Sequence, residues 1–150
     1  MKKVLVFGVF DLFHFGHLRL LKRAAKLGDY CIVAVQNDEY TKMYKQYETS
    51  GTLYSTEERI EMVRALRCVD EVITYNVVAD DIREIEFDIW VKGSDNVHSG
   101  IISAMEWCEQ NGKSVITLPR TEGISSTYIK HLINSFSKNE DDVNRGDTEG

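Results

Sequence analysis

The residues best suited to chemistry lie near the start of the chain, in the stretch "GVFDLFHFGH" at residues 8–17. Two histidines three positions apart, two glycines and one aspartate occupy positions that an ordinary strand and helix would fill with aliphatic residues. The stretch separates the apolar run "VLVF" from the helix-like run "LRLLKRAAKLG", so it forms a turn that enters a helix. Helix N-termini bind phosphate through unpaired amides and the macrodipole. We therefore expect a phosphate site here, with His14 and His17 as donors and with Gly8 and Gly16 letting the ligand approach the backbone.

Two other interpretations of this stretch compete with phosphate binding. A single histidine at a strand-to-helix junction is more often structural than catalytic, but the pair together with both glycines argues against that interpretation. Asp11, His14 and His17 could instead be three ligands of a zinc ion, although a zinc site would not require the glycines.

Composition and charge limit the classes of protein that remain. The 150 residues are 43% hydrophobic and 28% charged, which suits one globular domain. The net charge of −6 argues against a surface for nucleic acid or for an anionic membrane. The first apolar stretch is too short for a signal peptide or for membrane insertion, and the three cysteines are widely spaced. We therefore expect a cytoplasmic protein with reduced thiols.

The order of the predicted elements indicates the fold. Short β-rich runs alternate with longer segments that carry apolar residues at three- and four-residue spacing. This pattern predicts an α/β fold, a Rossmann-like open parallel five-stranded sheet with helices on both faces. We expect strands at 3–7, 30–35, 71–75, 89–92 and 114–118, each continuously apolar and therefore buried on both faces of the sheet. We expect helices at 17–27, 56–66, 79–85, 101–110 and 126–136.

Local signals mark several element ends and the domain boundary. Gly28 and Gly112 follow predicted helices, where a left-handed residue is favoured. The sequence "STEE" at 55–58 is typical of a capping box that opens a helix. Residues 137–150 contain one large aliphatic side chain, so we expect a domain at 1–136 followed by a disordered tail at 137–150 without a catalytic role.

Two motifs resemble those of one enzyme family. "GVFDLFHFGH" resembles the HxGH signature of the nucleotidyltransferase superfamily, and "RTEGISST" at 120–127 resembles the second signature of its cytidylyltransferases. With "RCVDEVI" at 67–73 between them, the spacing resembles that of the glycerol-3-phosphate cytidylyltransferases over nearly the whole globular part. The resemblance implies that CMP is transferred from CTP to a phosphate monoester with release of pyrophosphate. It also implies a homodimer.

The second motif has chemistry that fits this reaction. Residues 125–127 open the last predicted helix, so their amides and hydroxyls form another anion site, and Arg120 adds a permanent charge with a planar fork. The long segment 36–59 is polar enough to be a substrate loop, and its wall carries Lys42, Lys45 and Arg59 for the acceptor phosphate. We expect Mg²⁺ to be held mainly by the triphosphate, with Asp11 as its protein contact.

Residue chemistry and resemblance together give four sets of candidates. The candidate catalytic residues are His14, His17, Lys45 and Arg120. The candidate nucleotide-binding residues are Gly8, Val9, Phe10, Asp11, Gly16, His17, Gly93, Asp95, Arg120, Thr121, Gly123, Ile124, Ser125, Ser126 and Thr127. The candidate acceptor-binding residues are Lys42, Lys45 and Arg59, and the candidate metal ligand is Asp11.

Departures from the glycerol-3-phosphate pattern leave the substrate open. Val9 stands where those enzymes typically carry threonine, and "VKGSD" at 91–95 resembles the "VKGGD" of heptose-phosphate adenylyltransferases. The aromatic and hydroxyl residues of the long segment also suit a larger polyol or sugar phosphate. The alternatives to cytidylyl transfer are adenylyl transfer to a phosphosugar and a regulatory module that binds a nucleotide without turnover.

Overall fold

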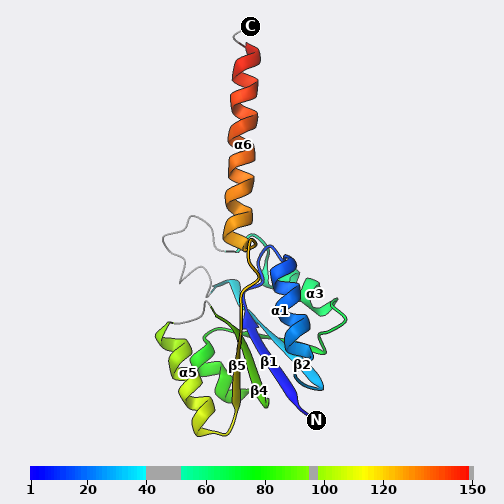
Figure 1. The fold of residues 1–150 in the computed structure, drawn as a ribbon, viewed down its shortest axis with the longest axis vertical. Coiled ribbons are helices and arrows are strands. Elements are labelled where there is room, and N and C mark those ends of the chain that lie inside the picture. Colours follow the sequence, from blue (N-terminus) through cyan, green and yellow to red (C-terminus); the bar gives the residue numbers. More distant parts are fainter. Residues whose placement is uncertain (40–51, 95–97, 149–150) are drawn as a thin grey trace.

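A parallel β-sheet forms the centre of the computed structural model, which describes residues 1–39, 52–94 and 98–148 (Figure 1). Five strands pair in the order β3-β2-β1-β4-β5, and every pairing is parallel. The fold class predicted from the alternating pattern is confirmed. The strands are β1 (Lys3–Gly8), β2 (Tyr30–Gln36), β3 (Glu71–Tyr75), β4 (Ile89–Gly93) and β5 (Ser114–Leu118).

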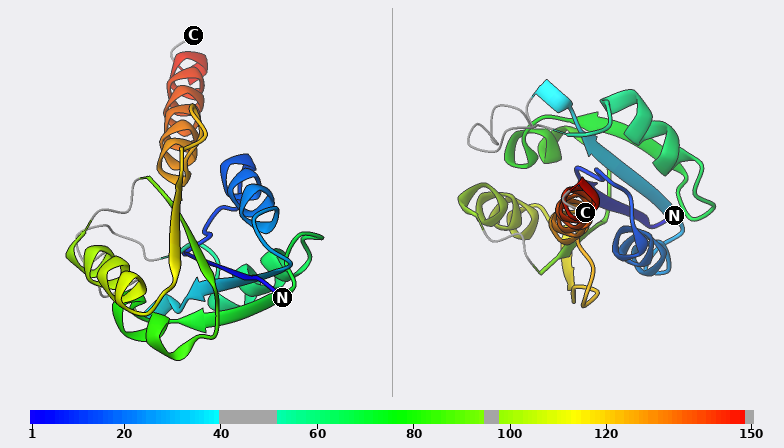
Figure 2. Two further views of the ribbon diagram at one scale, coloured as in Figure 1. Left: turned by 60° about the horizontal axis from the view of Figure 1, so that its bottom comes forward. Right: turned by 90° about the horizontal axis from the view of Figure 1, so that it is seen from above.

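Helices cover both faces of the sheet (Figures 1 and 2). On one face, α1 (Phe15–Ala25) and α3 (Thr56–Arg64) pack on a buried cluster that includes Val4, Val6 and Val33. On the other face, α4 (Val78–Asp81), the 3₁₀ turn η1 (Ile82–Glu84) and α5 (Ser99–Gln110) pack on a cluster that includes Leu5 and Trp90. The strand residues alternate between these two clusters, as they must in a sheet that is buried on both sides.

The edge strands differ from the prediction in their burial. We expected each strand to be buried on both faces, but β3 and β5 are only half-buried, while β1, β2 and β4 are almost fully buried. The reason is their place at the two edges of the sheet, where a single neighbouring strand flanks them.

Side chains determine where the helices begin. Ser55 and Glu58 form the predicted capping box of α3, with Ser55 N–H to Glu58 Oε1 at 2.9 Å and Glu58 N–H to Ser55 Oγ at 3.2 Å. The first helix begins at Phe15 rather than at the predicted His17, because the side chain of His14 caps it.

Gly28 and Gly112 both follow helices, but the backbone needs glycine at the two positions for different reasons. Gly112 has φ +70°, the left-handed conformation that the sequence predicted. Gly28 does not have a positive φ, so that prediction is wrong. A Cβ at Gly28 would lie 2.6 Å from Val4 Cγ2 and 2.8 Å from Lys2 O, so Gly28 instead allows the chain to pass close to β1.

The last helix, α6 (Ser126–Thr148), extends away from the sheet (Figures 1 and 2). The structure thus has a helix through most of the segment for which we predicted disorder. A helix needs only its own i→i−4 hydrogen bonds, whereas our expectation rested on the few apolar side chains available for packing. The boundary between a domain at 1–136 and a dispensable tail stays a prediction. Over the described ranges, none of the helices is both long enough and apolar enough to span a bilayer.

Candidate active site

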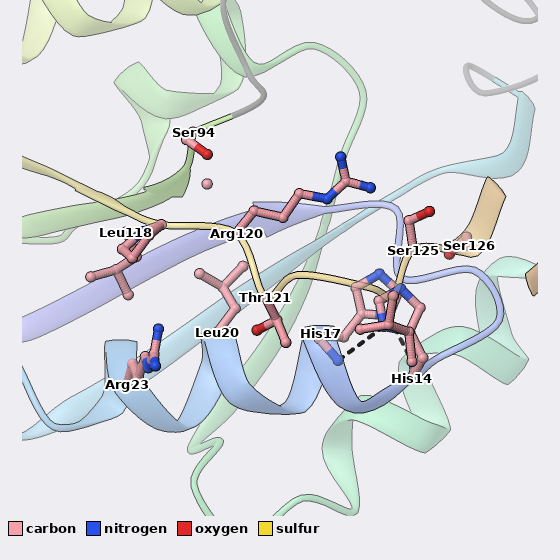
Figure 3. Close-up of a pocket in the computed structure, with 14 residues that line it drawn as sticks. His14, His17, Leu20, Arg23, Ser94, Leu118, Arg120, Thr121, Ser125 and Ser126 are labelled. Atoms are coloured by element: carbon pink, nitrogen blue, oxygen red, sulfur yellow. Dashed lines mark hydrogen bonds between the residues drawn. The ribbon is translucent and has the colours of Figure 1, made fainter. Parts of the chain in front are cut away.

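A pocket of about 220 Å³ lies at the carboxyl edge of the sheet (Figure 3). Its walls come from one side of α1, the ends of β4 and β5, and the start of α6. The carboxyl edge is where a parallel sheet is expected to bind ligands. The structure therefore brings the two motifs together although they are far apart in the sequence. The predicted site residues that line the pocket are His14, Gly16, His17, Gly93, Arg120, Thr121, Ile124, Ser125 and Ser126.

His14 and His17 form a reciprocal cap at the start of α1. Nδ1 of His14 accepts the N–H of Gly16 at 3.0 Å, and Nδ1 of His17 accepts the N–H of His14 at 3.2 Å. Because both Nδ1 atoms are acceptors, each neutral ring carries its proton on Nε2. The expectation that the first amides of α1 bind phosphate is therefore wrong for Gly16, whose amide is occupied. The hydrogen-bond donors that the pair presents to a ligand are the Nε2–H groups of His14 and His17.

The environment of the two rings keeps them neutral. They stack with their centroids 3.8 Å apart and their planes 22° apart, so two positive charges would repel each other. Burial, reinforced by His14 and opposed by Asp11, lowers the pKa of His17 from 6.5 to about 4. Burial, reinforced by Arg120, also lowers the pKa of His14. The pair therefore offers neutral hydrogen-bond donors near pH 7.

Aromatic rings surround the other sides of His17. Phe13 lies at a centroid distance of 5.3 Å and a plane angle of 34°, and Phe10 meets the ring edge-on at 5.4 Å and 70°. Phe10 is buried and has φ +57°, and Leu12 has φ +47°. Left-handed backbone costs about 1–2 kcal/mol for a residue with a Cβ, so this turn is strained where it carries the histidines.

The two glycines of the first motif make room for protein side chains. A Cβ at Gly8 would lie 2.6 Å from Cε2 and Cζ of Phe10, and a Cβ at Gly16 would lie 2.8 Å from Cε1 of His14. The sequence predicted that these glycines let a ligand approach the backbone. In the structure they instead let the Phe10 and His14 rings fold back onto their own turn.

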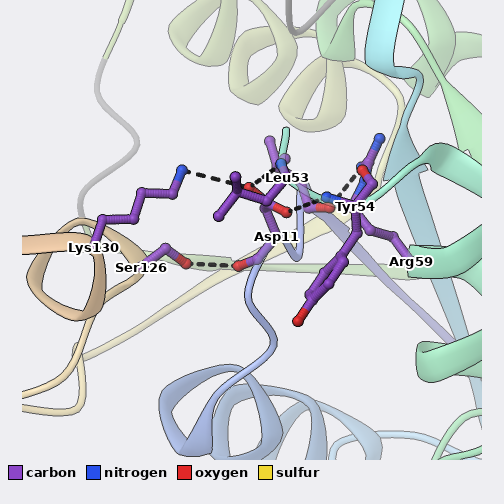
Figure 4. A network of polar contacts seen from close by, with 7 residues as sticks. Asp11, Leu53, Tyr54, Arg59, Ser126 and Lys130 are labelled. Carbon is purple, nitrogen blue, oxygen red and sulfur yellow. Dashed lines mark hydrogen bonds and ion pairs between the residues drawn. The ribbon is translucent and has the colours of Figure 1, made fainter. Parts of the chain in front are cut away.

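Asp11 joins three separate segments of the chain (Figure 4). Its carboxylate accepts the N–H groups of Leu53 at 2.9 Å and Tyr54 at 3.1 Å and lies 3.4 Å from Lys130 Nζ, while its carbonyl accepts the hydroxyl of Ser126 at 2.7 Å. Burial alone would raise the pKa of Asp11, but the two amides and Lys130 more than offset it and the net pKa is lowered.

These contacts do not fit a metal ligand at Asp11. The side chain is only 4% exposed, and both of its oxygens already have partners. The same contacts argue against the zinc alternative, and the described part of the chain holds no cluster of three or more metal-binding side chains. The prediction that Asp11 contacts Mg²⁺ is therefore corrected, because its carboxylate holds the chain together.

Arg59 also lies inside the protein rather than at the acceptor site. It is fully buried, and its guanidinium donates to the carbonyls of Val9 at 2.7 Å, Gln36 at 2.8 Å and Tyr54 at 3.1 Å. Burial lowers the pKa of Arg59, and Asp11 is first among the acidic groups that oppose this. The prediction that Arg59 binds the acceptor phosphate is corrected, because three backbone carbonyls take up its fork.

The second motif keeps fewer free hydroxyls than predicted. Ser125 Oγ caps α6 by accepting the N–H of Tyr128 at 3.0 Å, and Ser126 Oγ donates to Asp11. Gly123 has φ +80°, which explains glycine at that position. Arg120 lies in the middle of the pocket wall and is close enough to His14 to affect its pKa (Figure 3).

Two further cavities adjoin the first motif. One of about 270 Å³ is lined by Val9, Phe10, Asp11, His17, Ser126, Thr127 and Lys130, and so shares His17 and Ser126 with the first pocket. The other, of about 610 Å³, shares Val9 with it and is also lined by Gly8, Gln36, Asn76 and His98. The three cavities therefore follow one another along the turn of the first motif.

Some candidates lie outside the described residues, and some lining residues were missed. Lys42, Lys45 and Asp95 fall in ranges that the structure does not describe. Sequence reasoning missed Leu20 and Arg23, although three-residue spacing from His17 along α1 is a signal that points to both. It also missed Lys130, one helical turn after Ser126, and the lining residues Ser94, Leu118 and Pro119.

The sequence model of cytidylyltransferase-like proteins matches residues 5–132, a range that contains both motifs. The chain belongs to the cytidylyltransferase-like family. It is 41% identical over 138 residues to the glycerol-3-phosphate cytidylyltransferase of Bacillus subtilis (strain 168), covering 89% of this chain and 98% of that protein. It is 39% identical over 134 residues to the glycerol-3-phosphate cytidylyltransferase of Staphylococcus aureus, covering 87% of this chain and 93% of that protein.

A solved structure agrees with the family assignment. The lipopolysaccharide core biosynthesis protein from Thermoplasma volcanium GSS1 is similar with a TM-score of 0.63 and 25% identity, covering 81% of this chain and 97% of that chain. The cytidylyltransferase-like family thus accounts for the parallel sheet and for the two motifs at its carboxyl edge. Neither comparison assigns a role to an individual side chain.

Proposed function

We propose that this chain transfers the CMP group of CTP to glycerol 3-phosphate and releases pyrophosphate. The observation that carries the proposal is one pocket that holds two neutral histidines and Arg120 between the two motifs. Both relatives named above as glycerol-3-phosphate cytidylyltransferases are matched over nearly their whole length, which supports this donor and this acceptor.

The chemistry required of the protein is mainly positioning. An oxygen of the acceptor phosphate attacks the α-phosphorus in line, a new P–O bond forms, and the bond to the bridging oxygen breaks to release pyrophosphate. The acceptor phosphate is already ionised near pH 7 and needs no strong base. In this proposal the Nε2–H groups of His14 and His17 donate to the charge that develops on the leaving group, and Arg120 adds a fixed positive charge.

Neutral histidines suit this role better than cationic ones. Their Nδ1 atoms are held by backbone amides, so each Nε2–H points in a direction set by the cap of α1. A preorganised donor needs little reorganisation as the charge develops. A positive charge on the ring would require a proton on Nδ1 and would break the cap.

The acceptor needs a different place from the one that the sequence predicted. Arg59 is interior, and the lysines of the long segment lie outside the described residues. We propose that the acceptor enters through the 610 Å³ cavity, because the cavity between it and the first pocket shares Val9 with the one and His17 with the other. Lys130, which also pairs with Asp11, lines the cavity between them, and its positive charge favours an incoming phosphate.

Three other expectations stay predictions. Mg²⁺ is expected to arrive with the triphosphate, and no step above depends on it. A homodimer and a cytoplasmic location are also expected from the sequence and its resemblance.

Pyrophosphate release measured with CTP and ATP against a panel of phosphate monoesters tests the proposed function. We expect CTP with glycerol 3-phosphate to give the highest kcat/KM. His17→Ala should lower turnover by about a hundredfold or more, as loss of a preorganised donor does, whereas the exposed His131→Ala should not. Faster turnover with ATP and a phosphosugar would favour the adenylyltransferase, and absence of turnover with every pair would favour a regulatory module.

A further inference from the structure

Arg23 lies on the wall of the nucleotide pocket without a role in the reaction described above. It sits on α1, where His14, His17, Leu20 and Arg23 follow one another at three-residue spacing and all line the same pocket. Figure 3 shows Arg23 at the end of the pocket opposite His14. The helix therefore presents the histidine donors, which suit a phosphate, at its start and the cationic Arg23 further along the same wall of the pocket.

The distance along the helix places Arg23 away from the phosphates. At 1.5 Å per residue, the six positions from His17 to Arg23 span about 9 Å along the α1 axis. This is comparable to the distance from the α-phosphate of a nucleotide to the far edge of its base. A nucleotide whose α-phosphate lies beside the histidines therefore extends its base toward Arg23.

The surroundings of Arg23 suit a base. Leu20 and Leu118 form apolar walls beside it, as the flat face of a pyrimidine requires (Figure 3). The guanidinium has no hydrogen bond or ion pair to any residue in the described ranges, and the side chain is half-buried. A guanidinium has donors only, so it selects a ligand edge that carries acceptors.

We propose that Arg23 binds the edge of the cytosine ring and helps to select CTP. Cytosine carries two adjacent acceptors, O2 and N3, that fit a planar fork, whereas uracil has an N–H donor at N3. This inference rests on the proposed function, because it takes CTP as the substrate. It assigns to the first helix a second task, base recognition, in addition to positioning the histidines.

Arg23→Met tests this assignment, with Arg19→Met as the matched control. Methionine keeps the apolar stem and removes the donors, and Arg19 is an exposed arginine of the same helix that does not line the pocket. Titration calorimetry with CTP, CMP and inorganic tripolyphosphate separates base contacts from phosphate contacts. We expect Arg23→Met to weaken CTP and CMP by the same factor, about 10- to 100-fold, and to leave tripolyphosphate unchanged. Its preference for CTP over UTP in pyrophosphate release should fall.

Three outcomes would overturn the assignment. Weaker tripolyphosphate binding by Arg23→Met would place the guanidinium on a phosphate. Unchanged CTP affinity would remove Arg23 from the site, and an equal loss in Arg19→Met would reduce the effect to general electrostatics. Arg23→Lys, which keeps the charge and loses the fork, gives the same comparison if the methionine variant is unstable. Failure of the unaltered protein to bind CTP would refute the proposed function itself.

Discussion

Acidification should lower the free energy of unfolding, because His17 binds a proton more readily in the unfolded chain than in the folded one. Replacing His17 by a residue that does not titrate separates this effect from the protonation of other groups. Burial, with the charge that His14 would carry, lowers the pKa of His17 from 6.5 to about 4 in the folded chain. Between those values the unfolded chain binds a proton on this ring and the folded chain does not. The free energy of unfolding therefore has its full value above pH 6.5 and decreases as the pH falls toward 4.

The structure sets the size of this effect. A difference of about 2.5 between the two pKa values corresponds to about 3 kcal/mol when the titration is complete, and to about 2 kcal/mol at pH 5. The contacts show where the cost arises. Nε2 already carries a proton, so a second proton must go to Nδ1, which accepts the His14 N–H at 3.2 Å. Protonation of His17 thus breaks the cap of α1.

His17→Gln provides the comparison. Glutamine does not titrate, and at the third helical position its oxygen can still accept the amide of His14. Urea unfolding at pH 7.5 and pH 5 should show that the unaltered protein loses about 2 kcal/mol more than His17→Gln. His131→Gln, which removes an exposed histidine, should behave like the unaltered protein. An equal loss in all three proteins, or an NMR titration that gives His17 a pKa of 6 or above, would refute the reasoning.

Three further changes test other parts of the site. Gly16→Ala should lower turnover about a hundredfold, because its methyl group would displace the His14 ring. Near-normal pyrophosphate release by this variant would contradict this. Arg59→Met should lower the free energy of unfolding, measured in urea, by about 3 kcal/mol, because it leaves buried carbonyls unpaired. Unaltered stability would contradict this structural role of Arg59. A chain that ends at residue 136 should have the same melting temperature and turnover as the full chain. A large drop in either would show that the rest of α6 contributes to the domain.

The strands were predictable because their signal is local. β3 and β5 begin and end where the sequence predicted, since a short apolar run between turn residues is a signal within a few residues. The capping box at Ser55 was predictable for the same reason. The parallel order of the sheet followed from general rules on crossovers rather than from any single residue.

The errors concern side chains whose partners are distant in the sequence. Asp11 and Arg59 are charged residues near a predicted ligand site, so a ligand was the simplest partner to propose. Their actual partners are amides and carbonyls of the chain, up to 50 positions away, and no local pattern reveals them. The two glycines of the first motif were misinterpreted for a different reason. The rings beside them belong to residues only two positions away, but the space beside a missing Cβ can hold a protein ring as well as a ligand.

These same contacts explain how the strained turn of the first motif persists. Phe10 and Leu12 adopt left-handed backbone conformations that would relax unless the residues beside them were fixed. Arg59 holds the carbonyl of Val9, which precedes Phe10. Asp11 lies between the two strained residues, and its side chain and carbonyl are bonded to two other segments, residues 53–54 and α6. The turn is thus restrained on both sides of Phe10, and its ring is directed against Gly8 and His17. Two buried charges whose partners are groups of the chain itself therefore restrain the turn that carries the two proposed catalytic histidines.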